Sequence, residues 1–253
     1  GKPLSTAGMM IEDRTRTYTI AMERTVVPEN FSFRMTDEEY RVLEKIKNSI
    51  PVCYLADHAD FALGIVTGNN KKFLSAEKTE NSEMVLKGTD ICKYHINPVK
   101  QYLRFEPEQF QQVAPLEIYR APEKLLYRFI SNQLVVAYDD RQMLSLNSCN
   151  IVIPKIDGMQ IKYILAILNS SVSQFVYQKE FHSIKVLRAH MEHIPIPRVG
   201  KAIQNEIIAM TEPLICGMGK EAAETCQKRL DCRIMDLFRL SAEEQWIIRH
   251  ALH

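Results

Sequence analysis

Residues 163–197 read YILAILNSSVSQFVYQKEFHSIKVLRAHMEHIPIP, and this stretch decides the fold because a periodic apolar segment gives way within it to a basic one. In the first part, apolar side chains recur every three or four residues, which is the period of one buried helical face. These side chains are Ile161, Ile164, Leu165, Leu168, Val172, Phe175 and Val176. The pattern predicts a core helix and is not a cofactor-binding motif.

The segment after Gln178 differs, since positive charge and an aromatic ring arrive together with little acidic compensation. Its distinctive side chains are Lys179, Phe181, His182, Lys185 and Arg188. Basic groups beside an aromatic ring suit a phosphate backbone. We therefore expect a scaffold helix followed by a contact surface.

The bulk composition is that of an ordinary globular protein. Of the 253 residues, 46% are apolar and 25% are charged, and the formal net charge is +1. Such a balance neither requires nor excludes nucleic acid as a partner. Any site for a polyanion must therefore be a local patch of positive charge.

Targeting and redox signals are equally plain. No stretch reaches the roughly 18 consecutive apolar residues of a membrane span, and the first residues lack the pattern of a signal peptide. The six cysteines include no Cys-x-x-Cys pair, so they predict reduced thiols and neither a zinc knuckle nor a redox motif. We expect a cytoplasmic protein that has no membrane partner.

The first residues suggest a piece of a longer protein. The chain begins with Gly1 and continues KPLST, which we interpret as a tag remnant joined to an internal segment. On this interpretation a catalytic motif could lie upstream, outside the given sequence.

Capping signals predict the helices. Thr36 and Glu39 form a capping box that opens a helix to about Asn48, and Ser241 and Glu244 open the last helix in the same way. Apolar periodicity predicts two more helices at residues 202–218 and 222–238. Residues 15–35 alternate loosely and predict an extended arm or an edge strand.

The middle of the chain predicts β-structure. In residues 124–130 the odd positions are apolar, whereas Lys124 and Arg128 occupy even positions, so one face is expected in the core and the other can present cations. Residues 134–138 and 143–153 predict further strands. The pair Asp139-Asp140 is expected in the turn between them.

Two loops carry polar groups that suit nucleic acid. Residues 64–73, GIVTGNNKKF, combine glycines with asparagines that can read adenine and lysines that can pair with phosphate. Residues 85–94, VLKGTDICKY, place Lys87, Asp90, Lys93 and Tyr94 around a glycine turn. A solvated hairpin and a turn with a surface salt bridge are the respective alternatives.

Catalytic and metal motifs are weak. His190 and His193, with His182 upstream, have the wrong order for a His-Glu-x-x-His zinc helix, and Pro195 interrupts such a helix. Asp139 and Asp140 could act as paired carboxylates, but two predicted strands make them a polar turn. The pattern predicts no metal site and no catalytic residue.

The order of these segments carries a resemblance. The segments follow one another and span most of residues 41 to 197: LEKI, GIVTGNNKKF, LKGTDICKY, PEKLLYRFISNQLVVAYDD, LNSCNIVIP, YILAILNSS and KVLRAHMEHIPIP. This series closely resembles the TaqI-like specificity domain at the C-terminus of type IIG restriction-modification enzymes and related adenine-specific DNA methyltransferases. The tail LDCRIMDLFRLSAEE is similar to helices that close such proteins.

The resemblance implies a target-recognition role. In that family an upstream methyltransferase domain flips an adenine and methylates its exocyclic amine with S-adenosylmethionine. The family's Asn-Pro-Pro-Tyr motif is absent here, so this chain is not expected to methylate or cut DNA alone. S-adenosylmethionine, and magnesium where a nuclease is present, are expected only in the missing parent domains.

The resemblance also implies the DNA-facing residues. Asn70 and Arg128 are the expected base readers, because their side chains can form paired hydrogen bonds, whereas lysines suit phosphates. The full set is Thr67, Gly68, Asn70, Lys71, Lys87, Gly88, Asp90, Lys93, Tyr94, Lys124, Arg128, Lys185 and Arg188.

We therefore predict an α+β fold with a twisted mixed β-sheet covered by helices and a helical C-terminal subdomain. The expected divisions are an arm at 1–35, a target-recognition domain at 36–200 and a helical subdomain at 201–253. The expected partners are double-stranded DNA and the upstream methyltransferase domain. A docking module without base reading is one alternative, and a hydrolase that uses Asp139, Asp140 and the histidines is another. The DNA hypothesis requires the cations to gather on one side and to avoid internal ion pairs.

Overall fold

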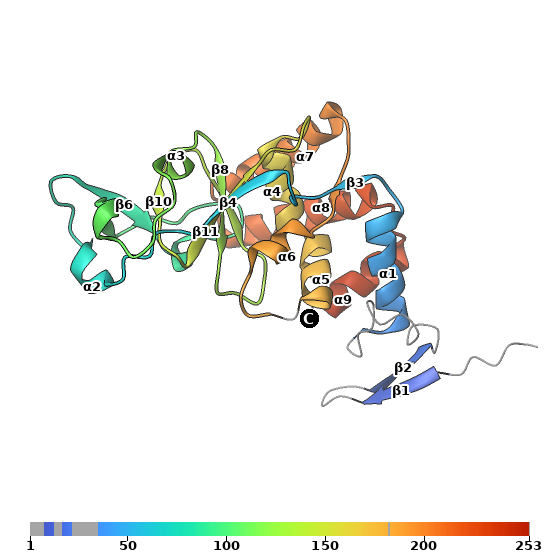
Figure 1. The fold of residues 1–253 in the computed structure, drawn as a ribbon. Helices are drawn as coiled ribbons and strands as arrows, with labels where there is room; N and C mark the ends of the chain where they lie inside the picture. Colours follow the sequence, from blue (N-terminus) through green and yellow to red (C-terminus); the bar gives the residue numbers. More distant parts are fainter. Residues whose placement is uncertain (1–7, 13–16, 22–34, 182, 253) are drawn as a thin grey trace, which may run out of the picture.

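The computed structural model describes residues 8–12, 17–21, 35–181 and 183–252. A β-rich end and a helical end meet at a central sheet (Figure 1). The central strands are β4 (Ala59–Ala62), β8 (Lys124–Arg128), β9 (Val136–Asp139) and β11 (Cys149–Pro154), in the antiparallel order β4-β11-β8-β9.

Both faces of the central sheet are covered. Leu125 and Tyr127 of β8 belong to one hydrophobic cluster, whereas Leu126 between them belongs to another. Because β8 lies inside the sheet with a core on each side, it presents no solvent-exposed cationic face. The alternation in residues 124–130 therefore predicted the strand correctly and its exposed face incorrectly.

A second sheet builds the β-rich end. Its order is β10-β6-β7-β5, with β10 and β6 parallel and the other pairs antiparallel. Its members are β5 (Leu74–Ser75), β6 (Ser82–Leu86), β7 (Tyr102–Arg104) and β10 (Leu144–Ser145). Short helical turns accompany it: α2 (Asn70–Phe73), η3 (Gly88–Asp90), η4 (Pro107–Gln109) and α3 (Leu116–Tyr119).

Two short antiparallel pairs complete the described strands. They are β1 (Gly8–Glu12) with β2 (Thr17–Ala21), and β3 (Val52–Cys53) with β12 (Ile196–Pro197). The predicted α+β class with mixed strand directions is confirmed, although the strands form separate small sheets.

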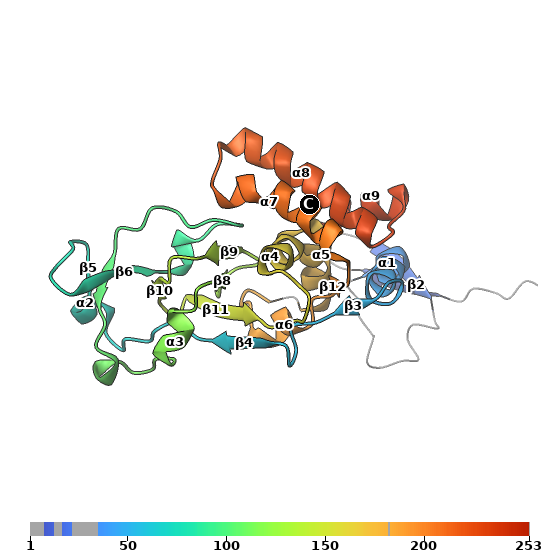
Figure 2. The same cartoon turned by 90° about the horizontal axis from the view of Figure 1, so that it is seen from above.

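The helices pack on one side of the central sheet. Figure 2 shows α7, α8 and α9 as a layer over α4 and α5. Side chains from α1, α4, α5, α7, α8 and α9 share one hydrophobic cluster with that sheet. The helices are α1 (Asp37–Asn48), α4 (Ile161–Asn169), α5 (Ser171–Glu180), α6 (Arg188–Glu192), α7 (Lys201–Ile215), α8 (Lys220–Leu237) and α9 (Ala242–Ala251).

The predicted capping boxes at Thr36 and Ser241 are confirmed. Each hydroxyl accepts a hydrogen bond from the backbone N–H three residues later, at 3.2 Å. The single helix expected around residues 163–176 is instead two helices, because Ser170 caps α5 by accepting from the N–H of Ser173. Periodicity did not reveal this break, since both helices bury apolar side chains.

The connection between α4 and α5 also covers the β9 edge of the central sheet. The Asn169 amide donates to the carbonyl of Val136 at 2.8 Å and accepts from its N–H at 3.1 Å. Beside it, the backbone of Tyr94 bonds to Val136 and Tyr138. The edge strand is therefore fully engaged by the chain itself.

Within the part of the chain that the structure describes, no helix is both long and apolar enough to cross a bilayer. The predicted divisions at residues 35 and 200 stay predictions. Most of the expected arm lies outside the described residues, and of it β1 and β2 are strands.

Candidate nucleic-acid interface

Hydrogen bonds connect several loops, and the segment 146–148 lies between them. Val66 and Gln112 exchange two backbone hydrogen bonds, and Asn147 donates its N–H to the carbonyl of Ile65. The Ser148 hydroxyl accepts from the N–H of Gly88, its carbonyl accepts from the N–H of Phe129, and Val186 donates to the carbonyl of Phe129 at 2.8 Å. We call residues 66–72, 87–90, 109–112, 129–131 and 184–186 the rim. Figure 1 shows α2 and the connection between β8 and β9 on the lower side of the molecule, away from α3 and α7.

The first part of the rim is the turn that leads into α2. Gly68 has a φ of +75°, a left-handed conformation that glycine adopts without steric cost. The Thr67 hydroxyl donates to Oδ1 of Asn70 at 2.6 Å, so it orients an amide that is itself exposed. Lys71 is exposed beside it. An oriented amide with a free lysine can bind a base edge and a phosphate.

The second part of the rim is the η3 turn. The Asp90 carboxylate accepts a hydrogen bond from the backbone N–H of Lys87 at 2.9 Å, so it does not pair with the Lys87 ammonium group. The Lys87 side chain is exposed. Gly88 must lack a side chain, because a Cβ there would lie 2.5 Å from the carbonyl oxygen of Ser148. The sequence therefore needs a glycine here for a close backbone approach.

The third part of the rim pairs two connections. Ser131 donates its N–H to the carbonyl of Ile184 at 2.9 Å, and Lys185 extends over the ring of Phe129, 5.9 Å from its centroid. Among the ion pairs of the described residues, none involves Lys71, Lys87 or Lys185. These three ammonium groups are available to an anionic partner.

Lys124 does not belong to this surface. Its side chain is fully buried, and its ammonium lies 2.6 Å from the Asp139 carboxylate directly across the strand pair. It also donates to the carbonyl of Tyr119. Burial lowers the pKa of Lys124, and the charge of Asp139 opposes that shift. The DNA contact predicted for Lys124 is corrected to a role inside the core.

Lys93, Tyr94 and Thr67 are also turned inward. Lys93 donates to the carbonyl of Asn169 at 3.0 Å, and burial lowers its pKa. The Tyr94 side chain is buried, which raises its pKa, and its φ of +75° is held by two backbone bonds to β9. Thr67 is buried as well. A side chain without exposed surface cannot reach a phosphate in this conformation, so the direct contacts predicted for Tyr94 and Thr67 are corrected.

Arg128 stabilises the rim through hydrogen bonds to the η3 turn. Its guanidinium donates to the carbonyls of Gly88 at 2.9 Å and Ile91 at 2.6 Å. These bonds use guanidinium N–H groups of Arg128 that were expected to read a base. Arg128 is therefore a positioning residue that holds the η3 turn.

Arg188 follows the rim segment 184–186 and, unlike the rim lysines, is paired with an acidic side chain. Its guanidinium pairs with Glu192 at 2.7 Å and lies 5.2 Å from the ring centroid of Phe61. Glu192 raises the pKa of Arg188 through that hydrogen bond. Its charge is compensated locally, so Arg188 is less available to phosphate than Lys185.

One rim residue, Gln111, was missed by the sequence reasoning, and Lys72 was considered only as part of the loop at residues 64–73. Lys72 is exposed and donates to Gln109 at 3.3 Å, and Gln111 is exposed beside Gly68. A Cβ at Gly68 would lie 3.4 Å from that of Gln111. Gln111 is about 40 positions away from Gly68 in the sequence, and only folding places it there.

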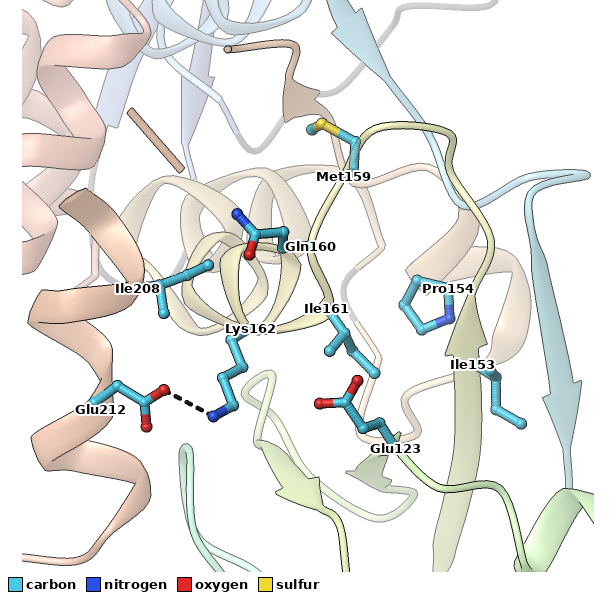
Figure 3. A pocket seen from close by; sticks show the side chains of 9 residues that line it. All are labelled: Glu123, Ile153, Pro154, Met159, Gln160, Ile161, Lys162, Ile208 and Glu212. Atoms are coloured by element: carbon cyan, nitrogen blue, oxygen red, sulfur yellow. Dashed lines mark hydrogen bonds and ion pairs between the residues drawn. The ribbon is translucent and has the colours of Figure 1, made fainter. Parts of the chain in front are cut away.

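An acidic cavity of about 540 Å³ lies elsewhere, between β11, α4 and α7. Figure 3 shows Lys162 paired with Glu212 and Glu123 on the opposite wall. Tyr138 donates a hydrogen bond to Glu123, and burial, followed by this bond, raises the Tyr138 pKa. Two carboxylates against one ammonium disfavour a phosphate, so this cavity is not part of the interface.

The histidines form an aromatic contact. His190 stacks on Phe181 at a centroid distance of 4.5 Å and accepts from the N–H of Leu187. Burial lowers its pKa, consistent with a neutral ring in that role. Among the described residues, no group of three His, Cys, Asp or Glu side chains could hold a metal ion.

Comparison with known proteins gives a family match over part of the chain. Residues 83–196 match the TaqI-like C-terminal specificity domain. This segment contains the η3 turn, the central strands except β4, and helices α4 to α6. No curated protein matches the chain.

Several solved structures align with most of the chain at low identity. The type IIL restriction-modification enzyme MmeI in complex with DNA has a TM-score of 0.47 at 10% identity, over 81% of this chain and 37% of that one. The HsdS subunit from Thermoanaerobacter tengcongensis has a TM-score of 0.42 at 14% identity, over 85% and 50%. The type IIG restriction endonuclease BpuSI has 0.45 at 11%, over 88% and 35%. The chain thus spans between a third and a half of these proteins.

Proposed function

We propose that the chain recognises a specific sequence in duplex DNA, starting from the match of residues 83–196 to the TaqI-like C-terminal specificity domain. The parent protein would be a restriction-modification enzyme or an adenine-specific DNA methyltransferase. The observation that carries the proposal is the rim, where three unpaired lysines and an oriented asparagine lie on loops that are bonded to one another.

The mechanism we propose is binding. Lys71, Lys87 and Lys185 would contact phosphates and set the register of the duplex, because a compact ammonium group suits a phosphate and carries no sequence information. Asn70 would read a base, since an amide can pair with both N6 and N7 of adenine. Its Oδ1 keeps a second lone pair after accepting from Thr67. Arg128 and Asp90 would hold the η3 turn in place.

The chemistry would belong to an adjoining methyltransferase domain. That domain would bind S-adenosylmethionine, which supplies the methyl group, and would flip the target adenine out of the stack. A nuclease domain, where present, would bind magnesium. The residues of this chain would fix where the duplex lies relative to those domains. Because its substrate is cellular DNA, the protein would act inside the cell.

A titration with duplex DNA tests the proposal. We expect the apparent association constant to fall steeply with salt, because each phosphate neutralised contributes about −0.9 to the slope of log K against log salt. Selection from a random duplex pool should then yield one preferred sequence. A docking module, the alternative, would show neither a steep salt slope nor enrichment, and either failure would contradict DNA recognition.

A further inference from the structure

Large apolar side chains are exposed at one end of the rim. Ile184 is 70% exposed and Ile130 is 54% exposed, and Leu187 follows on the same segment at 42%. The described residues include eight exposed large apolar side chains, and three of them lie on two neighbouring loops, the β8–β9 loop and the α5–α6 loop. Clustered apolar exposure of this kind marks a contact surface, whereas single exposed residues need no explanation.

The two connections are held rigidly in this arrangement. The carbonyl of Ile184 accepts from Ser131, and Val186, which is buried, donates to Phe129. On the other side, the Ser183 hydroxyl accepts from the N–H of Lys185, and the carbonyl of Ser183 accepts from Tyr177 at 3.0 Å. Exposed isoleucines on anchored loops do not collapse inward, so they are presented to a partner before it binds.

The residues around Ile130 and Ile184 indicate what kind of partner would bind there. Lys185 lies between Ile184 and the buried Val186 in sequence, and η3 with the exposed Lys87 joins the same connection through Ser148. Apolar groups flanked by unpaired ammonium groups suit a duplex, whose phosphates lie on either side of stacked bases. A protein partner would need acidic groups opposite both lysines.

We propose that Ile130 and Ile184 form an apolar wedge that inserts at a base step of the bound duplex, between phosphates held by Lys87 and Lys185. This inference rests on the proposed function. Isoleucine is among the side chains that proteins insert between base pairs, and such insertion partly unstacks the step and bends the helix.

The wedge has a distinct thermodynamic signature. A lysine contact releases counterions, so its loss lowers affinity and flattens the salt dependence. An apolar contact releases no counterions, so its loss lowers affinity by the same factor at every salt concentration. The two kinds of contact can therefore be separated on one protein.

The experiment compares the double variant Ile130→Thr/Ile184→Thr with Leu116→Thr. Threonine keeps the β-branched shape of isoleucine, and Leu116 is the control because it is 46% exposed on α3, which Figure 1 shows on the upper side of the molecule, away from the connection between β8 and β9. Each protein is titrated, at several salt concentrations, with the duplex selected from the random pool. A second duplex series carries 2-aminopurine at each position in turn. Urea unfolding checks that all three proteins are equally folded.

We expect the double variant to bind about tenfold more weakly with an unchanged salt slope, since two partly buried isoleucines lose apolar contact area. Wild-type protein should raise 2-aminopurine fluorescence at one step, and the double variant should not. Wild-type affinity in the double variant, or an equal loss in Leu116→Thr, overturns the wedge while DNA recognition stands. Failure of wild-type protein to bind any duplex overturns both.

Discussion

At the scale of single residues, the same side-chain type has opposite roles in this chain. Lys124 and Lys185 are both next to apolar residues in sequence, yet Lys124 is enclosed with Asp139 and Lys185 is exposed. The difference arises because β8 is an inner strand with a core on each face, whereas residues 184–186 lie at the margin. A lysine is available to DNA only where the fold leaves it unpaired.

The buried pair predicts a stability effect. Replacing Lys124→Met should lower the free energy of unfolding by about 3 to 5 kcal/mol, because Asp139 would be left charged and uncompensated in the core. Urea unfolding measures the change. The double variant Lys124→Met/Asp139→Asn should recover part of the loss, since it removes the stranded charge and keeps an acceptor oxygen for one of the two N–H groups, of Arg141 and Met143, that donate to Asp139. A single variant as stable as wild type would show that the pair contributes little.

At the scale of elements, the break between α4 and α5 has a structural purpose. Ser170 ends one helix and caps the next, and this leaves Asn169 pointing at the edge of β9. The amide mimics a peptide group and bonds to both polar atoms of Val136.

Replacing Asn169→Leu tests this element. The volume is nearly kept, but the buried N–H of Val136 loses its partner, whereas the carbonyl keeps the N–H of Tyr94. Because one such loss costs about 1 to 3 kcal/mol, we expect the free energy of unfolding to fall by that amount, measured in urea. Asn48→Leu, on the exposed face of α1, is the matched control and should change little. Equal effects of the two substitutions would show that the contact between Asn169 and Val136 does not stabilise the fold.

At the scale of the whole molecule, charge is nearly balanced and its arrangement matters more than its sum. The chain carries 32 basic and 31 acidic residues. Ion pairs such as Lys45–Glu244 and Arg233–Glu206 hold many of these charges within the helical layer. The rim lysines lack such partners among the described residues, as do Lys201, Lys220 and Lys228 of the helical layer, so their position on the rim, and not the lack of a partner, distinguishes them.

A comparison of two triple variants separates position from net charge. Neutralising Lys71, Lys87 and Lys185 to glutamine should reduce the magnitude of the salt slope for DNA binding by about 2 to 3, since each lysine accounts for one phosphate. Neutralising Lys201, Lys220 and Lys228, which are exposed on α7 and α8, removes the same charge from the helical layer. That control should keep most of the slope. Equal reductions would mean that only net charge matters.

Much of the architecture could be predicted from local sequence. Thr36 and Ser241 marked helix starts because a capping box acts within four residues, and the apolar spacing in residues 161–176 marked a buried helical surface. The order of the motifs also indicated the specificity domain, which the match over residues 83–196 supports. Interactions between residues that are close in sequence can be predicted from the sequence alone.

The candidate site could be predicted only in part. The loops around Asn70 and Lys87 were identified, but the burial of Thr67, Tyr94 and Lys124 was not, because it depends on which segments pack against them. Gln111 joins the rim only when Val66 pairs with Gln112.

The sequence by itself determined the class of secondary structure, the helix starts and the presence of lysines without neighbouring acids. The tertiary structure alone decided which of those lysines reach solvent and which side chains stand together. The physical reason is that exposure and ion pairing are set by partners distant in the chain. A strand pattern cannot reveal whether a second core will cover its polar face.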